Sequence, residues 1–167
     1  MATLHLMVGL PCSGKTTRAK ILEQEYNALL LSTDRWHIKL FGNDALDPAH
    51  DKRHENVEEI LWEIAKRVLT LGTDVILDFG FWAKAERIYF KNEAKELGVS
   101  FKIHFMDVPK EELYKRLEQR NKESPEGAFT IPREYMDEYI KVFQPVEQDE
   151  LAEGIDKKTI GMWHNCT

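Results

Sequence analysis

The sequence predicts a single α/β domain in which a parallel β-sheet carries helices on both faces. Short apolar runs alternate along the chain with helical segments, and a glycine-rich turn joins the first run to the first helix. Parallel strands need a long crossover between them, which such helices supply. A length of 167 residues suffices for one compact domain and is short for two, so we expect one domain over residues 1–167.

Local patterns place the elements of this domain. Apolar runs predict strands at residues 3–8, 28–31, 73–79 and 99–106, with a fifth at 154–160. Helices are expected over residues 15–25, 48–71, 84–97, 109–121 and 130–144. Residues 122–129 are polar and contain Pro125 and Gly127, which predicts a mobile loop. The tail at 161–167 receives no assignment.

Charge and cysteine content limit the functional classes. The net charge is −6 and the isoelectric point is about 5.6, which argues against general nucleic-acid binding, because neutralisation of phosphates supplies most of that affinity. A local basic groove from Lys39, Lys52 and Arg53 stays compatible with this balance. No apolar run reaches bilayer length, and Cys12 lies within the glycine-rich turn, so we expect a reduced, cytoplasmic protein.

The glycine-rich turn is a phosphate-binding loop. Residues 9–16 read GLPCSGKT and satisfy the pattern G-x-x-x-x-G-K-[ST] between a strand and a helix. Backbone N–H groups of such a loop turn inward around phosphate oxygens, Lys15 reaches the outer phosphates, and Thr16 is a ligand for Mg²⁺. The expected cofactors are ATP and Mg²⁺. The expected cofactor-binding residues are Gly9, Pro11, Cys12, Ser13, Gly14, Lys15, Thr16 and Thr17.

Two aspartates follow predicted strands, where the ends of parallel strands face a ligand crevice. Asp34 is a candidate general base for an attacking hydroxyl, with the N-cap of a following helix as the alternative. Asp78 ends the run Val75-Ile76-Leu77 and is a candidate Mg²⁺ ligand beside Thr16, with a turn-forming aspartate as the alternative.

Two arginines lie one turn apart on the helix that precedes the polar loop. Arg116 and Arg120 are candidates for clamping a transferred phosphoryl group. A solvated face, on which Glu112 offsets the repulsion between the two, is the alternative.

Histidines and tryptophans near the expected crevice have competing interpretations. His50, His54 and Glu58 share a helix face, but their charged surroundings favour a solvated face over a metal site, and the segment is also placed to line an acceptor pocket. Trp36 and Trp82 follow the second and third strands and suit either stacking on an acceptor or core packing.

The order of the motifs resembles a P-loop kinase family of AAA-type, ATP-binding small kinases. This family is related to polynucleotide 5′-hydroxyl kinase, chloramphenicol phosphotransferase and zeta toxin. The matching motifs are GLPCSGKTT, LLLSTD, VILDFGFW with Arg87, DVPKEELYKRLEQR and a proline-opened helix before Phe143-x-Pro145, which together span residues 3–150.

The resemblance implies a three-layer α/β/α fold with strand order 2-3-1-4-5 and a helical lid at about residues 116–131. It also implies MgATP as donor, a hydroxyl acceptor and Asp34 as general base. Lys15 and Thr16 match donor and magnesium residues, and Arg116 and Arg120 match lid arginines. Family members often carry Asp-x-x-Arg after the second strand, whereas this chain has Asp34-Arg35-Trp36-His37. The resemblance therefore does not imply the identity of the acceptor.

Three functions follow from these observations. The first is transfer of the γ-phosphoryl group of MgATP to a small-molecule hydroxyl, such as that of an antibiotic, nucleoside or metabolite. The second is phosphorylation of a polynucleotide 5′-hydroxyl, and the third is ATP-gated binding without transfer. A switch GTPase is disfavoured because the guanine-reading signature Asn-Lys-x-Asp is absent, and a remodelling ATPase because Phe79 follows Asp78.

Overall fold

A computed structural model describes residues 1–123 and 128–151. Its elements are β1 (Thr3–Val8), α1 (Lys15–Tyr26), β2 (Leu29–Ser32), α2 (Thr33–Phe41), α3 (His50–Thr70), β3 (Val75–Gly80), α4 (Lys84–Glu96), β4 (Ser100–Phe105), α5 (Lys110–Glu123), α6 (Arg133–Val142) and α7 (Gln148–Leu151). None of these helices is both long and apolar enough to cross a membrane.

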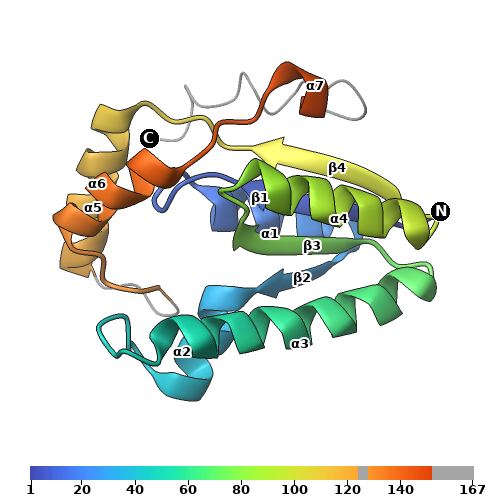
Figure 1. Cartoon of the computed structure of the whole chain (residues 1–167), viewed down its shortest axis with the longest axis horizontal. Coiled ribbons are helices and arrows are strands. Elements are labelled where there is room, and N and C mark those ends of the chain that lie inside the picture. Colours follow the sequence, from blue (N-terminus) through green and yellow to red (C-terminus); the bar gives the residue numbers. More distant parts are fainter. Residues whose placement is uncertain (124–127, 152–167) are drawn as a thin grey trace.

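The sheet is parallel and its strands lie in the order β2-β3-β1-β4 (Figure 1). This is the first four-strand part of the predicted 2-3-1-4-5 order, so the fold class is confirmed, with four strands among the described residues. The fifth strand expected at 154–160 lies outside the described residues. Ser32 pairs with Asp78 and Val8 with Gly80, so the carboxyl ends of β2, β3 and β1 meet at one edge.

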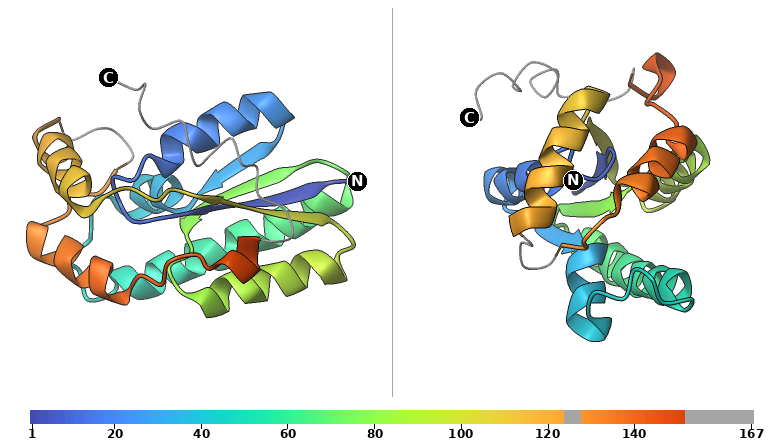
Figure 2. Two further views of the ribbon diagram at one scale, coloured as in Figure 1. Left: turned by 90° about the horizontal axis from the view of Figure 1, so that it is seen from above. Right: turned by 90° about the vertical axis from the view of Figure 1, so that its left-hand side faces the viewer.

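Helices cover both faces of the sheet, as Figure 2 shows, because the central strands are apolar on both sides. The larger core packs Leu4, Leu6 and Val8 of β1 against residues of α3 and α4, including Leu61 and Ala94. On the opposite face, Met7 and Ile76 pack against Ala19 and Leu22 of α1. The alternation of side chains along β1 therefore builds the predicted three-layer α/β/α arrangement.

Helix α2 is an element that the sequence analysis did not assign. It begins directly after β2, with Ser32 at the N-cap position and Asp34 inside the first turn. The N-cap alternative for Asp34 is therefore wrong, and its carboxylate lies at the positive end of a helix. Helices α2, α5 and α6 gather at the end of the sheet where the strands end (Figure 1).

A small third core joins α5 and α6 above this end of the sheet. Its buried residues are Leu117, Phe129, Ile131 and Met136. Cys12 of the glycine-rich loop and Ile38 of α2 pack against them. The helices of the predicted lid region are therefore in direct contact with the loop and with α2.

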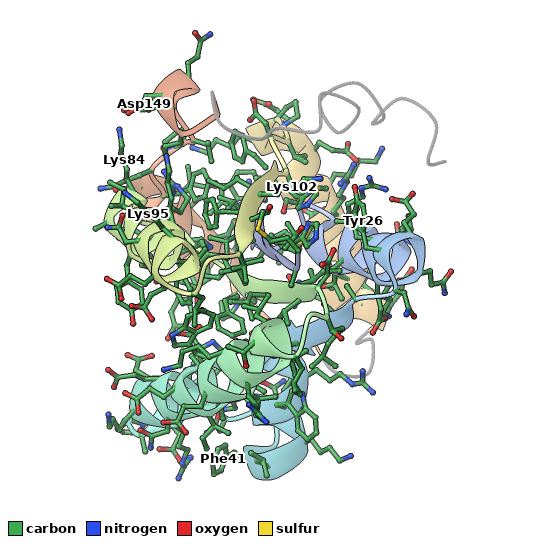
Figure 3. All side chains as sticks on the ribbon, turned by 90° about the vertical axis from the view of Figure 1, so that its right-hand side faces the viewer. Tyr26, Phe41, Lys84, Lys95, Lys102 and Asp149 are labelled. Atoms are coloured by element: carbon green, nitrogen blue, oxygen red, sulfur yellow. The ribbon has the colours of Figure 1, made fainter. Side chains whose placement is uncertain are left out.

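Arg87 of α4 fixes the segment that follows α6. Its side chain is 1% exposed, and its Nε and Nη2 atoms donate to Glu150 at 2.6 and 3.0 Å. The same guanidinium donates to the carbonyl groups of Phe81, Trp82, Gln144 and Pro145. Nearby, Lys84 pairs at the surface with Glu147 and Asp149, and Figure 3 labels Lys84 and Asp149 on this side of the molecule.

Replacing Arg87 by methionine is expected to lower the free energy of unfolding by about 3–5 kcal/mol, because Glu150 then keeps a charge in a buried position without its partner. Urea unfolding of the purified variant measures this loss. Lys84→Met is the control, since it removes an ion pair that is open to solvent, and its effect is expected to be much smaller. Equal losses in the two variants would contradict a structural role for the Arg87–Glu150 pair.

Candidate functional site

A large cavity of about 1430 Å³ opens at the carboxyl edge of the sheet. The glycine-rich loop, the ends of β2 and β3, and parts of α2, α3, α5 and α6 line it. Among the predicted site residues it contains Pro11, Cys12, Gly14, Lys15, Thr16, Thr17, Asp34, Asp78, Arg116 and Arg120. Because these residues come from four separate segments, the fold brings together groups that the sequence only indicated one by one.

The phosphate-binding loop has a backbone path that depends on glycine. Gly9 has a φ of +153°, and a Cβ atom there would lie 2.7 Å from Ser13 Oγ and 3.1 Å from the Met106 carbonyl oxygen. Gly14 is left-handed, with a φ of 88°, at the N-cap of α1. Larger residues at either position would move the loop away from the helix N-terminus, where backbone N–H groups and the helix dipole favour anions.

Lys15, Thr16 and Asp78 form a connected group at the start of α1. Lys15 Nζ donates to the Leu10 carbonyl at 2.8 Å, and Thr16 Oγ1 donates to Asp78 Oδ2 at 2.7 Å. Burial lowers the pKa of Lys15, against the opposing effect of Asp78 and Asp34. Burial raises the pKa of Asp78, against the opposing effect of Lys15. The hydroxyl and carboxylate oxygens of Thr16 and Asp78 are donors of the type that Mg²⁺ prefers, so this pair fits a magnesium ion beside the loop.

Asp34 lies in the first turn of α2 and lines the cavity. Its side chain is 51% exposed, so it is accessible to a second molecule in the cavity. The protein around this carboxyl displaces part of its water and raises the pKa of Asp34, against the opposing effect of the positive charges of Lys15 and Arg120. Lys15 therefore interacts electrostatically with both Asp34 and Asp78.

The two arginines of α5 reach the phosphate-binding loop. Arg116 Nε donates to Glu112 at 2.7 Å, as the solvated-face alternative requires, but its Nη1 also lies 3.5 Å from the Cys12 carbonyl oxygen. Arg120 Nη2 donates to the Phe129 carbonyl at 2.9 Å, and its Nη1 is 3.7 Å from Cys12 Sγ. Within residues 1–123 and 128–151, the buried Nε of Arg120 has no hydrogen-bond partner. The arginines are thus half-buried beside the loop and do not form a solvated face.

The histidine face of α3 is also turned toward the cavity. His50, His54 and Glu58 are half-buried and line it, so the prediction of a solvated face is wrong. The reason is α2, which packs alongside α3 and brings His37 to within 3.2 Å of His54 (Nδ1 to Nδ1). Burial, together with His37 and His50, lowers the pKa of His54 to about 4, so its imidazole is neutral near pH 7.

The sequence analysis did not identify two residues of this region, His37 and Asp44. His37 is fully buried, and Asp44 accepts hydrogen bonds from His37 at 2.6 Å and from His50 at 2.7 Å. His37 lies three residues after Asp34, which places both on one side of a helix, but that signal is available only once α2 is assigned. Asp44 lies in the connection after α2, and no local pattern marks it.

Acidic and aromatic side chains line the half of the cavity beyond Asp34. Burial, with Glu86 and Asp34 nearby, raises the pKa of Glu58 to about 7. The aromatic lining residues include Trp36, Trp82, Tyr135 and Tyr139. Trp36 is 42% exposed, whereas Trp82 packs on Tyr139 and donates to the Gly9 carbonyl at 3.2 Å. Trp36 therefore keeps the stacking interpretation, and Trp82 supports the loop.

Wild-type protein is expected to lose stability relative to Glu58→Gln as the pH rises from about 4.5 to about 7. The pKa of Glu58 is 4.5 in the reference state and about 7 in the folded protein, so ionisation is disfavoured by folding. Below this pH window the Glu58 carboxyl is protonated in both the folded and the unfolded protein. Above it the carboxyl is ionised in both, and the full loss of stability relative to Glu58→Gln is present. Melting temperatures of the two proteins across this range measure the difference, with the exposed Glu59→Gln as control. A difference that does not change with pH would contradict the environment described for Glu58.

Comparisons with known proteins agree with this arrangement. A family model described as an AAA domain matches residues 4–146. A putative kinase from Chloroflexus aurantiacus has a TM-score of 0.69 and 16% identity over 83% of this chain and 74% of that chain. Chaetomium thermophilum Kti12, in complex with ADP-AlF3, has a TM-score of 0.66 and 22% identity over 87% of this chain and 82% of that chain. A search among curated proteins finds no match.

A chain of the Pnkp1/Rnl/Hen1 RNA repair complex has a TM-score of 0.65 and 22% identity over 92% of this chain and 46% of that chain. The present chain therefore spans less than half of that protein. At these identities the solved structures show a shared fold. The family model covers most of the sequence and confirms the resemblance that the order of the motifs indicated. The chain thus belongs to the AAA domain family, as a P-loop kinase-like domain.

Proposed function

We propose that this protein is a cytoplasmic phosphotransferase that moves the γ-phosphoryl group of ATP to a hydroxyl group of a small molecule. The proposal rests on the residues that line one cavity. It holds a phosphate-binding loop with the Thr16–Asp78 pair, and it also holds Asp34, an accessible carboxylate on a different element. An accessible carboxylate beside the phosphate-binding loop can accept the proton of an attacking hydroxyl group.

The loop residues account for binding of the donor. Backbone groups of residues 9–14 and the N-terminus of α1 would surround the phosphates, and Lys15 would pair with the outer ones. Thr16 and Asp78 would hold Mg²⁺, which neutralises charge on the phosphate oxygens when bound. Kti12 in complex with ADP-AlF3 and an APS kinase in complex with AMPPNP are neighbours in fold, which supports an adenine nucleotide.

Asp34 accounts for activation of the acceptor. In this proposal its carboxylate accepts the proton of the attacking hydroxyl as the oxygen–phosphorus bond forms and the bond to the leaving ADP breaks. Desolvation raises the pKa of Asp34, and Lys15 and Arg120 oppose that rise, which helps to keep the ionised form that a base needs. Most of the rate enhancement would come from positioning and electrostatic stabilisation.

The region around residues 116–131 would act as the lid. Arg116 and Arg120 already lie beside the loop, and Leu117 and Phe129 attach this region to α6. Closure would place the arginines against the transferred phosphoryl group and exclude water, which suppresses hydrolysis of ATP.

The charges in the cavity favour a small-molecule acceptor over a polynucleotide. Of the three cations that would form a basic groove, Lys52 pairs with Glu55, and Arg53 pairs with Asp44 and Asp47. Lys39 lies over the ring of Trp36 at the cavity wall. Beyond Asp34 the lining includes Asp51 and Glu86, which would repel a phosphodiester backbone, beside the cations Arg35 and Lys39.

The test uses γ-labelled ATP with Mg²⁺ against two sets of acceptors in parallel, a 5′-hydroxyl oligonucleotide and a panel of small hydroxyl compounds. We expect label on a small molecule. Label on the oligonucleotide, weakening as salt rises, would establish the polynucleotide alternative, for which the fold of the RNA repair protein is a precedent. ATP binding with neither ADP release nor a labelled product would establish the ATP-gated binding protein.

Asp34→Asn is expected to reduce phosphoryl transfer by about 10²–10⁴-fold while the affinity for MgATP changes little, because the substitution removes a proton acceptor and leaves the loop intact. Transfer of label and equilibrium binding of a fluorescent ATP analogue measure the two effects. Asp47→Asn, which lies outside the cavity lining, is the control. Parallel loss of ATP binding in Asp34→Asn would contradict the assignment of Asp34 as the base.

A further inference from the structure

Three potential metal ligands meet where α2 and α3 join. His37 comes from α2, His50 is the first residue of α3, and Asp44 lies in the connection between the helices. One ligand atom from each lies within 4.8 Å of the other two. Asp44 Oδ1 is 2.6 Å from His37 Nε2 and 2.7 Å from His50 Nδ1. Two imidazole nitrogens thus face the same carboxylate oxygen.

The cluster is enclosed by protein. The side chain of His37 is fully buried, and those of Asp44 and His50 are 9% and 19% exposed. Phe129 packs edge-on against both imidazoles, with ring centroids 5.3 and 5.2 Å apart. Phe41, labelled in Figure 3, packs edge-on against His37 at 5.2 Å. His50 also lines the large cavity, which gives an ion and one water molecule a route to the cluster.

The contacts around the cluster are those that support metal ligands. Arg53 Nη1 donates to Asp44 Oδ2 at 2.7 Å, which fixes the carboxylate and leaves Oδ1 directed at the two imidazoles. His54 Nδ1 lies 3.2 Å from His37 Nδ1. When His37 Nε2 binds an ion, its ring proton moves to Nδ1, and His54 accepts the resulting hydrogen bond. Such outer partners orient ligating groups and raise their affinity for metal.

We propose that His37, Asp44 and His50 bind a divalent transition-metal ion of the zinc class, at a site whose ligands are distinct from Thr16 and Asp78. Imidazole nitrogen with one carboxylate is a donor set for Zn²⁺, whereas Mg²⁺ prefers oxygen ligands alone. Zinc–ligand distances of about 2.0–2.2 Å require the two short contacts of Asp44 to open slightly. Residues 42–49, which form no helix or strand, give Asp44 that freedom.

The ion would attach α2 to α3 close to Asp34, which lines the cavity. His37 lies one helical turn after Asp34, so a bond from its imidazole fixes the start of α2 relative to the wall formed by α3. The site is therefore structural, and it stands whether or not the proposed phosphotransfer is correct.

The test measures Zn²⁺ binding by the full chain without nucleotide, after removal of any affinity tag and of bound metal by a chelator. Calorimetry and metal analysis after gel filtration are expected to show one Zn²⁺ per chain more in the wild type than in His50→Gln. His50 is chosen because it is partly exposed, and circular dichroism checks that the variant folds. Asp47→Asn is the matched control, because Asp47 also contacts Arg53 but is not a ligand, and it should keep the wild-type stoichiometry.

Binding of Co²⁺ to the wild-type protein gives a second measurement that does not depend on any variant. We expect visible absorption bands of a four-coordinate nitrogen and oxygen site without the charge-transfer band of a cobalt–thiolate bond. Equal Zn²⁺ stoichiometry in wild type and His50→Gln, no Zn²⁺ binding at all, or a thiolate band would each overturn the proposal. The first two outcomes would leave Asp44 as the acceptor of a purely hydrogen-bonded network.

Discussion

The parallel register of β2, β3 and β1 is the constraint on which the candidate site depends. Because Ser32 pairs with Asp78 and Val8 with Gly80, the last residues of the three strands lie at one edge of the sheet. The phosphate-binding loop leaves β1 there, and α2 with Asp34 leaves β2 there. The hydrogen bond from Thr16 to Asp78 then links the loop to β3. A slip of one residue would turn Asp78 to the other face of the sheet and separate it from Thr16.

The cavity brings two carboxylates and a lysine close together, and burying these charges has an electrostatic cost that neighbouring cations reduce. Burial raises the pKa values of Asp34 and Asp78 and lowers that of Lys15; the lysine and the two carboxylates offset part of each other's cost, whereas Asp34 raises the pKa of Asp78 further. In the proposed phosphotransferase a triphosphate would bring further negative charge into the same space. That charge would call for additional cations, which a magnesium ion at Thr16 and Asp78 and the arginines of α5 would provide. The partly buried Arg120, with a hydrogen-bond donor that lacks a partner in the described part of the chain, is suited to that role.

The sequence predicts the parts of this protein that local patterns determine. The phosphate-binding loop, all four described strands and five of the helices follow from apolar runs, glycine and proline positions. Helix α2 was not predicted, because the segment 33–41 is short and its packing on α3 is not visible in a local pattern. For the same reason the histidines of α3 were assigned to solvent, although α2 buries them. The bond between Arg87 and Glu150 joins residues 63 positions apart, and no pattern of either segment indicates the other.

Phe129 connects the two halves of the cavity. Its carbonyl oxygen accepts a hydrogen bond from Arg120, while its ring packs against His37 and His50 on the opposite wall. Packed interiors resist small continuous shifts, so a displacement of α5 must be accompanied by repacking around these imidazoles. Phe129 thereby joins the wall that carries Asp34 to Arg120, which lies beside the phosphate-binding loop. In a phosphotransferase this coupling would assemble the phosphate clamp when the acceptor wall is ordered, which favours transfer to the acceptor over transfer to water.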